Sequence, residues 1–264
     1  MCQTISFVPC NRWMMNRFSS WCFAAAFCLL AWAAHAVVFN PPMLFSTGST
    51  SAVIDLGTAT GGSGASSAKV TIGAGGVPAG STIVVQVTPT NPAATISVTD
   101  TAVNTYVRQN RVFYDSGVLV TAAYICQNCL ALIPGNTITF TVSVGNSILS
   151  ALAIKTTQAT SLDLNTSPIN SGASKITNPT ITSGTPSTAG EIFVGMIGFV
   201  TVSPTSTMVL ATGGWQQPPD FASTGFTQSQ GGGWIKNAGT SPQTYNPTLS
   251  ANNFVGAMLF SFKL

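Results

Sequence analysis

Short runs of β-prone residues, separated by clusters of Gly, Pro, Asn, Ser and Thr, make up most of the chain. After residue 36 no stretch keeps the apolar period of 3.6 residues that an amphipathic helix requires. The candidate strands are residues 53–56, 68–72, 82–87, 95–98, 105–108, 111–114, 118–125, 137–144, 150–155, 191–200, 207–211, 234–236 and 253–263. Strands at intervals of roughly 8 to 15 residues predict an all-β fold, an antiparallel β-sandwich of jelly-roll or Greek-key type.

Two of these segments carry the clearest patterns. Residues 137–144 alternate Thr or Ser with Ile, Phe and Val, which predicts a strand with one buried and one hydroxyl-bearing face. Residues 191–200 are almost entirely apolar, which predicts a central strand buried on both faces. Residues 165–188 and 212–233 are rich in Gly, Ser, Asn, Gln and Pro, and we interpret the first as a long loop or weakly patterned hairpin.

The first 36 residues have the pattern of a secretory signal peptide. An uninterrupted apolar and small-residue run at 21–34 is followed by Ala34-His35-Ala36, an A-x-A cleavage site. The run is shorter than the 18 or more residues of a membrane-spanning helix, although an uncleaved anchor remains the alternative. Met14 and Met15 directly precede this pattern and are alternative natural starts. We therefore expect residues 37–264 to be a single exported β-sandwich domain, secreted or held at the cell surface.

Charge is scarce throughout the chain. Charged residues make up 6% of the sequence, whereas an ordinary soluble domain carries about 25%. No basic run is present, and the net charge of +3 falls further once Arg12 and Arg17 leave with the leader. Such a chain lacks the phosphate contacts of a nucleic-acid binder. Sheet edges without blocking charges would also permit self-association.

The chain's one histidine, His35, also lies in the leader, so residues 37–264 contain none. That absence removes the commonest general base and a common zinc ligand. We predict no cofactor and no metal.

Of the six cysteines, only Cys126 and Cys129 follow the leader. In an exported chain we expect a small disulfide that stiffens a turn; a free or redox-active pair is the alternative.

Six acids follow the leader, and five of them are candidates for a glycosidase pair, which needs two carboxyl groups at a sugar bond. They are Asp100, Asp115, Asp163, Glu191 and Asp220. Asp100 and Asp115 lie beside Ser, Thr and Gly, as turn residues do. No G-x-S-x-G elbow is present. We predict that the protein is not an enzyme, with a glycan-active enzyme as a less favoured reading.

Loop aromatics give the best hint of a ligand. Trp215, Trp234 and Tyr245 lie in or beside a Gly-, Gln- and Ser-rich region, where exposed rings would stack on sugars. The alternative is that the tryptophans close the end of the sandwich core.

Several motifs carry a resemblance to a known group of domains. They are Asp100-Thr-Ala-Val-Asn-Thr-Tyr106, Phe113-Tyr-Asp115, Tyr124-Ile-Cys-Gln-Asn-Cys129 with 131–139, Thr188-Ala-Gly-Glu-Ile-Phe-Val-Gly195 and Gly214-Trp215. Together, over roughly residues 50 to 264, the chain resembles a β-sandwich domain of uncharacterised bacterial secreted proteins and of phage virion or tail proteins. In that group the first turn often has a glycine where this chain has Val103. The resemblance implies a surface or adhesive role and brings no catalytic residues.

These observations favour a non-enzymatic exported structural or adhesive surface module, with a surface glycan or a protein as partner and no nucleic acid. The alternative is a carbohydrate-binding module that uses Trp215, Trp234 and Tyr245. An outer-membrane β-barrel is less favoured, because most of the runs are shorter than barrel strands.

Overall fold

The structure is a computed structural model that describes residues 51–61, 66–89, 95–114, 119–143, 147–172, 174–200, 208–209, 211–217, 223–225 and 228–264. Residues 48–264 form one compact unit. The predicted leader with Met14 and Met15, and the acids Asp115 and Asp220, lie outside the described residues.

The first eight strands build two antiparallel sheets. The strands are β1 (Val53–Thr60), β2 (Ser67–Thr71), β3 (Thr82–Pro89), β4 (Ile96–Asp100), β5 (Val107–Tyr114), β6 (Leu119–Cys126), β7 (Thr137–Val142) and β8 (Ser147–Ile154). The middle sheet has the order β1-β8-β3-β6-β5, and the small sheet has the order β2-β7-β4. The pairing is nested, because β1 pairs with β8, β2 with β7 and β3 with β6.

The later strands build a third sheet and two short ribbons. They are β9 (Leu162–Asn170), β10 (Ile181–Thr182), β11 (Ile192–Val200), β12 (Met208–Val209), β13 (Ser223–Gly225), β14 (Gln228–Lys236), β15 (Thr244–Tyr245), β16 (Thr248–Leu249) and β17 (Phe254–Phe262). The C-terminal sheet has the order β13-β14-β11-β17-β9, and β10-β15 and β12-β16 form the ribbons.

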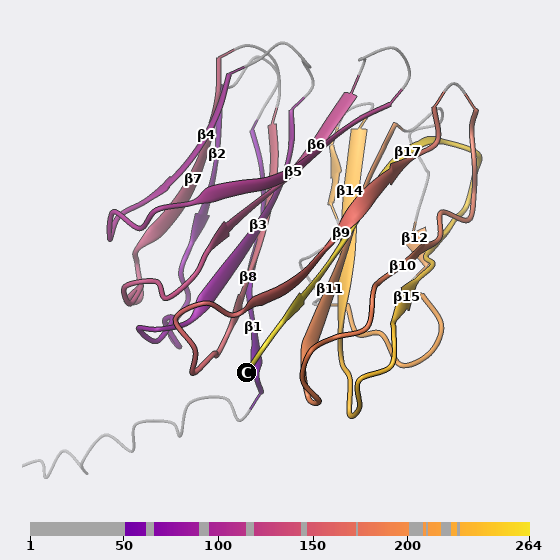
Figure 1. Cartoon of the computed structure of the whole chain (residues 1–264). Coiled ribbons are helices and arrows are strands. Elements are labelled where there is room, and N and C mark those ends of the chain that lie inside the picture. Colours follow the sequence, from indigo (N-terminus) through magenta and orange to yellow (C-terminus); the bar gives the residue numbers. More distant parts are fainter. Residues whose placement is uncertain are drawn as a thin grey trace, which may run out of the picture. The chain divides into compact units, whose positions relative to one another are not determined.

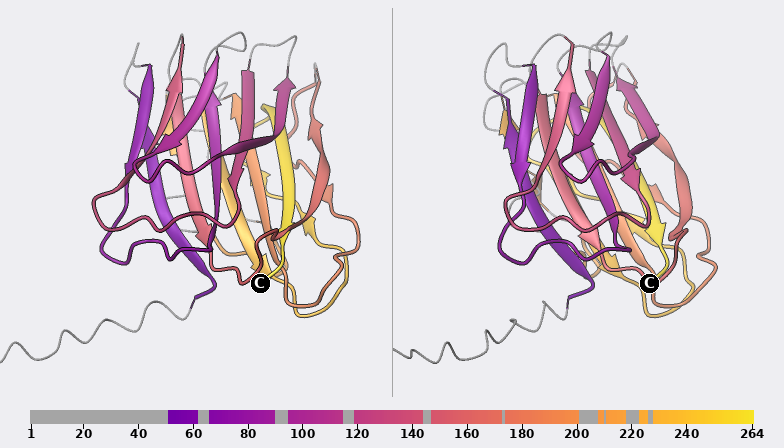
Figure 2. Two further views of the ribbon diagram at one scale, coloured as in Figure 1. Left: turned by 60° about the vertical axis from the view of Figure 1, so that its left-hand side comes forward. Right: turned by 90° about the vertical axis from the view of Figure 1, so that its left-hand side faces the viewer.

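The three sheets are stacked, with the middle sheet between the other two (Figure 1). The right-hand view of Figure 2 looks onto the small sheet, with the other layers behind it. One core cluster, containing Val85 and Phe140, joins the small and middle sheets. A second, containing Val84 and Phe260, joins the middle and C-terminal sheets. The predicted all-β antiparallel sandwich is confirmed, and it contains one layer more than a simple pair of sheets.

Alternation along the strands produces this stacking. The neighbours Val84 and Val85 on β3 point to opposite faces and enter different clusters, so every residue of β3 is buried. Ile138, Phe140 and Val142 are the buried face of β7, as the alternating pattern predicts. The apolar run at 192–200 is a central strand, flanked by β14 and β17, and its residues 192–199 are buried.

The sequence interpretation was wrong at two segments. Residues 162–170 form the edge strand β9, and we interpreted residues 165–170 of it as part of a loop or weakly patterned hairpin. The strand β14 begins at Gln228, although we expected it to begin only at Trp234. In both places the polar or glycine-rich sequence hides the strand, because pairing with β17 or β11 supplies the order that local propensity lacks.

A layer of polar side chains crosses the core between the middle and C-terminal sheets. The Gln86 amide donates to Thr121 Oγ1 at 3.2 Å and to the carbonyl of Ile197 at 2.9 Å. The Gln230 amide donates to Ser150 Oγ at 2.6 Å. These bonds set the register of the two sheets, because a slip would bury the amides unpaired.

The outer edges carry features that oppose further strand pairing. β9 contains Pro168 and two register irregularities, and β5 carries Arg108 and Arg111 with one irregularity. In the described part of the chain, no helix has the length and apolar character needed to span a membrane.

Candidate functional site

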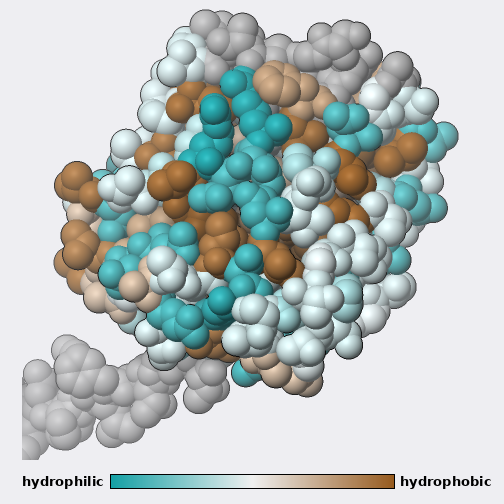
Figure 3. Space-filling view, in the orientation of Figure 1, coloured by the Kyte–Doolittle hydropathy of each residue, from teal (hydrophilic) through white to brown (hydrophobic). Residues whose placement is uncertain are grey.

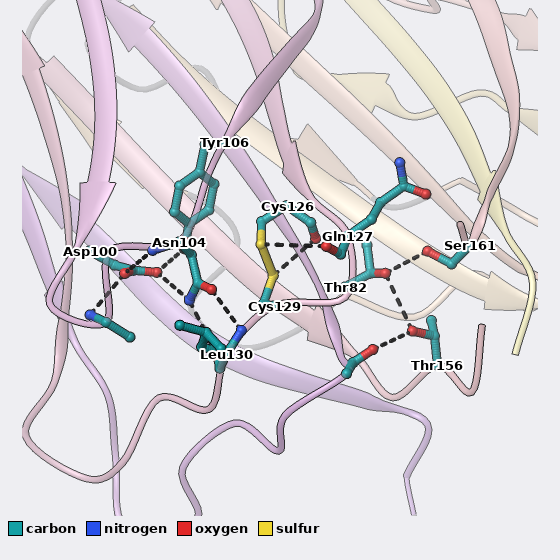
Figure 4. The surroundings of a disulfide bond; sticks show 12 residues. Thr82, Asp100, Asn104, Tyr106, Cys126, Gln127, Cys129, Leu130, Thr156 and Ser161 are labelled. Atoms are coloured by element: carbon teal, nitrogen blue, oxygen red, sulfur yellow. Dashed lines mark hydrogen bonds between the residues drawn. A yellow bond between two sulfur atoms is a disulfide. The ribbon is translucent and has the colours of Figure 1, made fainter. Parts of the chain in front are cut away.

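A cysteine pair fixes the loop that leaves β6. The sulfur atoms of Cys126 and Cys129 lie at disulfide distance, 2.07 Å apart, and both residues are buried (Figure 4). Cys129 exchanges backbone hydrogen bonds with the segment before β3, donating to Ser81 at 2.9 Å and accepting from Gly80 at 2.8 Å. The predicted disulfide pair is therefore present, and it holds the loop against the neighbouring chain segment.

Asp100 organises the facing loop, which joins β4 to β5. Its Oδ1 accepts from the backbone N–H groups of Ala102 at 2.9 Å and Asn104 at 3.0 Å. Its Oδ2 accepts from the Asn104 amide at 2.9 Å and from the Tyr106 hydroxyl at 2.8 Å. Burial raises the pKa of Tyr106, and the hydrogen bond to Asp100 and the Asp100 charge raise it further. Asp100 thus has the turn role that the sequence predicts.

Asn104 joins the two loops. Its side-chain oxygen accepts from the backbone N–H of Leu130 at 2.6 Å, and its amide donates to the Leu130 carbonyl at 3.2 Å (Figure 4). Such a two-point contact fixes both the position and the orientation of a backbone. The loop after β6 is therefore held by the cysteine pair on one side and by Asn104 on the other.

Val103 lies in a conformation that costs energy. Its φ is 61°, a left-handed value that favours glycine and is a genuine outlier for a β-branched residue. Its side chain gains no compensating burial, since the residue is 85% exposed. The turn hydrogen bonds of Asp100 to Ala102 and Asn104 hold Val103 in this conformation, and strained residues of this kind cluster at functional sites.

Val103 belongs to a group of exposed aliphatic residues that we call the apolar loop end. Its members are Val103, Leu130 and Ile133, of which Leu130 is 60% and Ile133 is 63% exposed. Figure 3 shows hydrophobic groups at the left-hand edge, where the β4–β5 and β6–β7 loops lie in Figure 1. An apolar surface on firmly held loops is suited to contact with another surface.

Hydrogen bonds on the far side of the cysteine loop join it to the C-terminal half. The side-chain oxygen of Gln127 accepts from the backbone N–H of Leu162, where β9 begins, at 2.8 Å. Thr82 and Ser161 share a hydroxyl hydrogen bond, and Thr156 donates to the Gly80 carbonyl at 2.9 Å (Figure 4). Gln127 thus attaches the cysteine loop to the start of β9, and the hydroxyl bonds attach the neighbouring start of β3 to the segment between β8 and β9.

The three aromatic residues predicted as a ligand site do not form one. Tyr245 is fully buried and Trp215 is 7% exposed, with ring centroids 4.8 Å apart, in a cluster on the outer face of the C-terminal sheet. Trp234 packs in the different cluster between the two large sheets. The correction has a simple cause: the ribbons β10-β15 and β12-β16 cover the outer face, and the large rings fill the space beneath them. The alternative, that the two tryptophans pack in the core, holds for Trp215, and Trp234 is partly buried; Tyr245 is a further core residue.

The three described acids of the candidate glycosidase set each have a partner within the fold. Asp100 is engaged in its turn, and Asp163 lies 2.9 Å from Lys263. Glu191 is fully buried, and its Oε1 accepts hydrogen bonds from Thr188.

The residues of the apolar loop end were not among the predicted site residues. Leu130 and Ile133 lie among ordinary loop residues, and exposed single aliphatics are common. The one available signal was Val103, at a turn position where the proposed resemblance leads us to expect glycine.

No protein-family model matches the chain, and neither a curated protein nor a solved structure matches it.

Proposed function

We propose that the protein is a non-enzymatic exported surface module that attaches to a protein partner through the apolar loop end. The observation that carries this proposal is Val103, an exposed aliphatic residue held at a strained φ of 61°. Residues with strained backbone conformations cluster at binding and active sites. Leu130 and Ile133 add exposed aliphatic surface beside it.

The rigidity of the loops supports a binding role. Asp100 orders one loop, the cysteine pair orders the other, and Asn104 joins them. Loops fixed before binding lose little conformational freedom in the complex, which raises affinity. A protein partner is favoured over a glycan because the surface is aliphatic and the predicted stacking rings of Trp215 and Tyr245 are buried.

Export and topology complete the proposal. A disulfide at Cys126 and Cys129 suits an oxidising compartment outside the cytosol, as the signal pattern of residues 1–36 also predicts.

The nested pairs β1–β8, β2–β7 and β3–β6 favour a jelly-roll interpretation of the first eight strands, with β5 displaced into the middle sheet. The role follows the one that the resemblance to secreted and virion domains implies.

Fractionation of cells that express the full chain tests the location. We expect a mature chain that begins after Ala36 and is labelled on intact cells by a membrane-impermeant amine reagent. The three exposed lysines Lys69, Lys175 and Lys236 provide sites for the label. A chain found only in the soluble periplasmic or cytosolic fraction would overturn the proposed surface role.

A further inference from the structure

Three charged or ionisable side chains meet at the lower end of the C-terminal sheet. Asp163 lies on β9, Glu191 directly precedes β11, and Lys263 directly follows β17. Because β17 lies between β11 and β9, these three positions are brought side by side. The register places Phe262 opposite both Ile192 and Leu162, and the Lys263 backbone donates to Ser161 at 2.7 Å. The pairing of the strands therefore fixes the backbone positions from which these three side chains extend.

The amine and one carboxyl group are in contact. Lys263 Nζ lies 2.9 Å from Asp163 Oδ1, with 25% and 9% of the respective side chains exposed. An isolated surface ion pair would be mostly hydrated and mobile. This pair is largely removed from water and is held by backbone pairing on adjacent strands.

The second carboxyl group has no role in the ion pair. Glu191 is fully buried, and its Oε1 accepts hydrogen bonds from the backbone N–H and the hydroxyl of Thr188 at 3.1 and 2.9 Å. No N–H or O–H group of the described chain donates to its buried Oε2. The Glu191 side chain lies close enough to Asp163 to contribute to the lowering of the Asp163 pKa. Burying a carboxyl group without a charge partner is costly, so this placement calls for an explanation beyond packing.

Ser187 completes the arrangement around Asp163. Its backbone N–H donates to Oδ2 and its hydroxyl donates to Oδ1, both at 2.7 Å. Two fixed donors on a carboxyl group are the geometry that stabilises negative charge developing on its oxygen during attack at carbon. A nucleophile, an electrophilic carbon, a proton carrier and donors for the oxygen are thus present together.

We propose that Lys263 and Asp163 form an intramolecular amide crosslink, with Glu191 transferring the protons. Lys263 Nζ forms a bond to Asp163 Cγ, and one Cγ–O bond breaks. The ammonium group brings three hydrogens: one stays on the amide nitrogen, and two leave with the carboxyl oxygen as water. Charge balances, because one ammonium and one carboxylate give a neutral amide and water. No oxidant, reductant or cofactor is consumed.

The ion pair is the state from which this reaction starts. Burial raises the pKa of Asp163, but hydrogen bonds from the side chain and backbone of Ser187 and the contact with Lys263, with a smaller contribution from nearby Glu191, outweigh it and lower the pKa to about 2. A proton must therefore move from the ammonium to the carboxylate before the amine can attack. Glu191, close to Asp163 and screened from water, is placed to carry that proton and to return one to the leaving oxygen.

The crosslink would join the edge strand β9 to the last strand of the chain. β9 has a neighbour on one side alone, so pairing with β17 is its main attachment. A covalent bond at the end of this pair prevents the two strands from separating. The inference does not depend on the proposed attachment through the apolar loop end.

Intact mass spectrometry of the purified mature chain, fully reduced and denatured, tests the proposal. We expect a mass lower than that of the sequence by one water, and a proteolytic peptide pair joined through Asp163 and Lys263. The full sequence mass would overturn the proposal, and so would a water loss located at any other residue.

Variants separate the chemistry from folding. Lys263→Arg retains the positive charge but cannot form the amide, so we expect the full mass with an unchanged β-sheet circular dichroism spectrum. Glu191→Gln is close in shape and lacks the transferable proton, so we expect the full mass or slow loss of water over days. A Glu191→Gln chain that is folded and loses water as fast as the wild type would contradict the role of Glu191.

Discussion

The ring of Tyr245 packs directly against the Cα of Gly195, so that a Cβ on Gly195 would lie 2.6 Å from Cδ1 of the ring. Both residues are buried, and the ring is held by Trp215. Gly195→Ala should therefore lower the free energy of unfolding by about 1 to 3 kcal/mol, as overpacking of a rigid core does. Urea denaturation followed by tryptophan fluorescence measures it.

Gly231 provides the matched control on the neighbouring strand β14. A Cβ there would lie 2.6 Å from Cε of Met208, the end of a flexible side chain that is half-buried. Methionine can move aside, so Gly231→Ala should cost less than about 1 kcal/mol. An equal decrease in the free energy of unfolding for the two variants would show that the Tyr245 ring is no more rigid a neighbour than the Met208 side chain.

Val103→Asn should make the protein more stable. Asparagine tolerates the left-handed conformation far better than a β-branched residue, and the side chain at this position is exposed. We expect the free energy of unfolding to rise by about 1 kcal/mol. Ile133→Asn, a change at another exposed aliphatic residue that has no positive φ, should give no gain. A Val103→Asn chain less stable than the wild type would contradict the inference that the backbone at Val103 is strained.

Reduction of the cysteine pair should have a modest effect on the fold. The loop closed by Cys126 and Cys129 is short, and the chain-entropy relation for so short a loop gives a loss of about 2 kcal/mol or less. Thermal unfolding of the wild type and of the Cys126→Ser, Cys129→Ser double variant, each with and without reductant, measures it. The double variant should not respond to reductant, and complete unfolding of the reduced wild type would contradict the estimate.

Acid unfolding should reveal the state of Asp163. In a chain without the amide crosslink, the Asp163 pKa is about 2 when folded, against an ordinary value of 3.8. The unfolded chain then binds the proton first, so stability is full above pH 3.8 and is lost as the pH falls toward 2. We expect this loss in the Lys263→Arg variant and a smaller one in the crosslinked wild type, in which Asp163 no longer titrates. Identical acid profiles for the two chains would argue that the wild type carries no crosslink.

Strands with a clear alternating or continuous apolar pattern were predictable. The residues of β7 alternate between apolar and hydroxyl-bearing types because one face of that strand is buried. The residues of β11 are almost all apolar because both of its faces are buried. β9 was not predictable, since Asn165 and Pro168 break the apolar pattern and the strand depends on its register with β17. Nor does local sequence reveal the third layer, which arises where β3 is covered on both faces.

The candidate site was less predictable than the fold. The turn role of Asp100 and the pairing of Cys126 with Cys129 follow from local residue types. The two-point contact between Asn104 and Leu130 joins residues from different loops, and the local sequence of neither loop predicts it. The burial of Trp215 and Tyr245 likewise depends on ribbons formed by distant segments.

Attachment of cells displaying the chain tests the central claim most directly. Wild type is compared with the triple variant Val103→Asn, Leu130→Ser, Ile133→Ser and with a control carrying Lys69→Ser and Lys236→Ser, at matched surface amounts, on a surface coated with the cells' own exported proteins. We predict attachment by the wild type and the control and at least a tenfold loss, which corresponds to about 1.4 kcal/mol, in the folded triple variant. Equal attachment by the triple variant and the wild type would contradict the proposal that the apolar loop end is the contact surface.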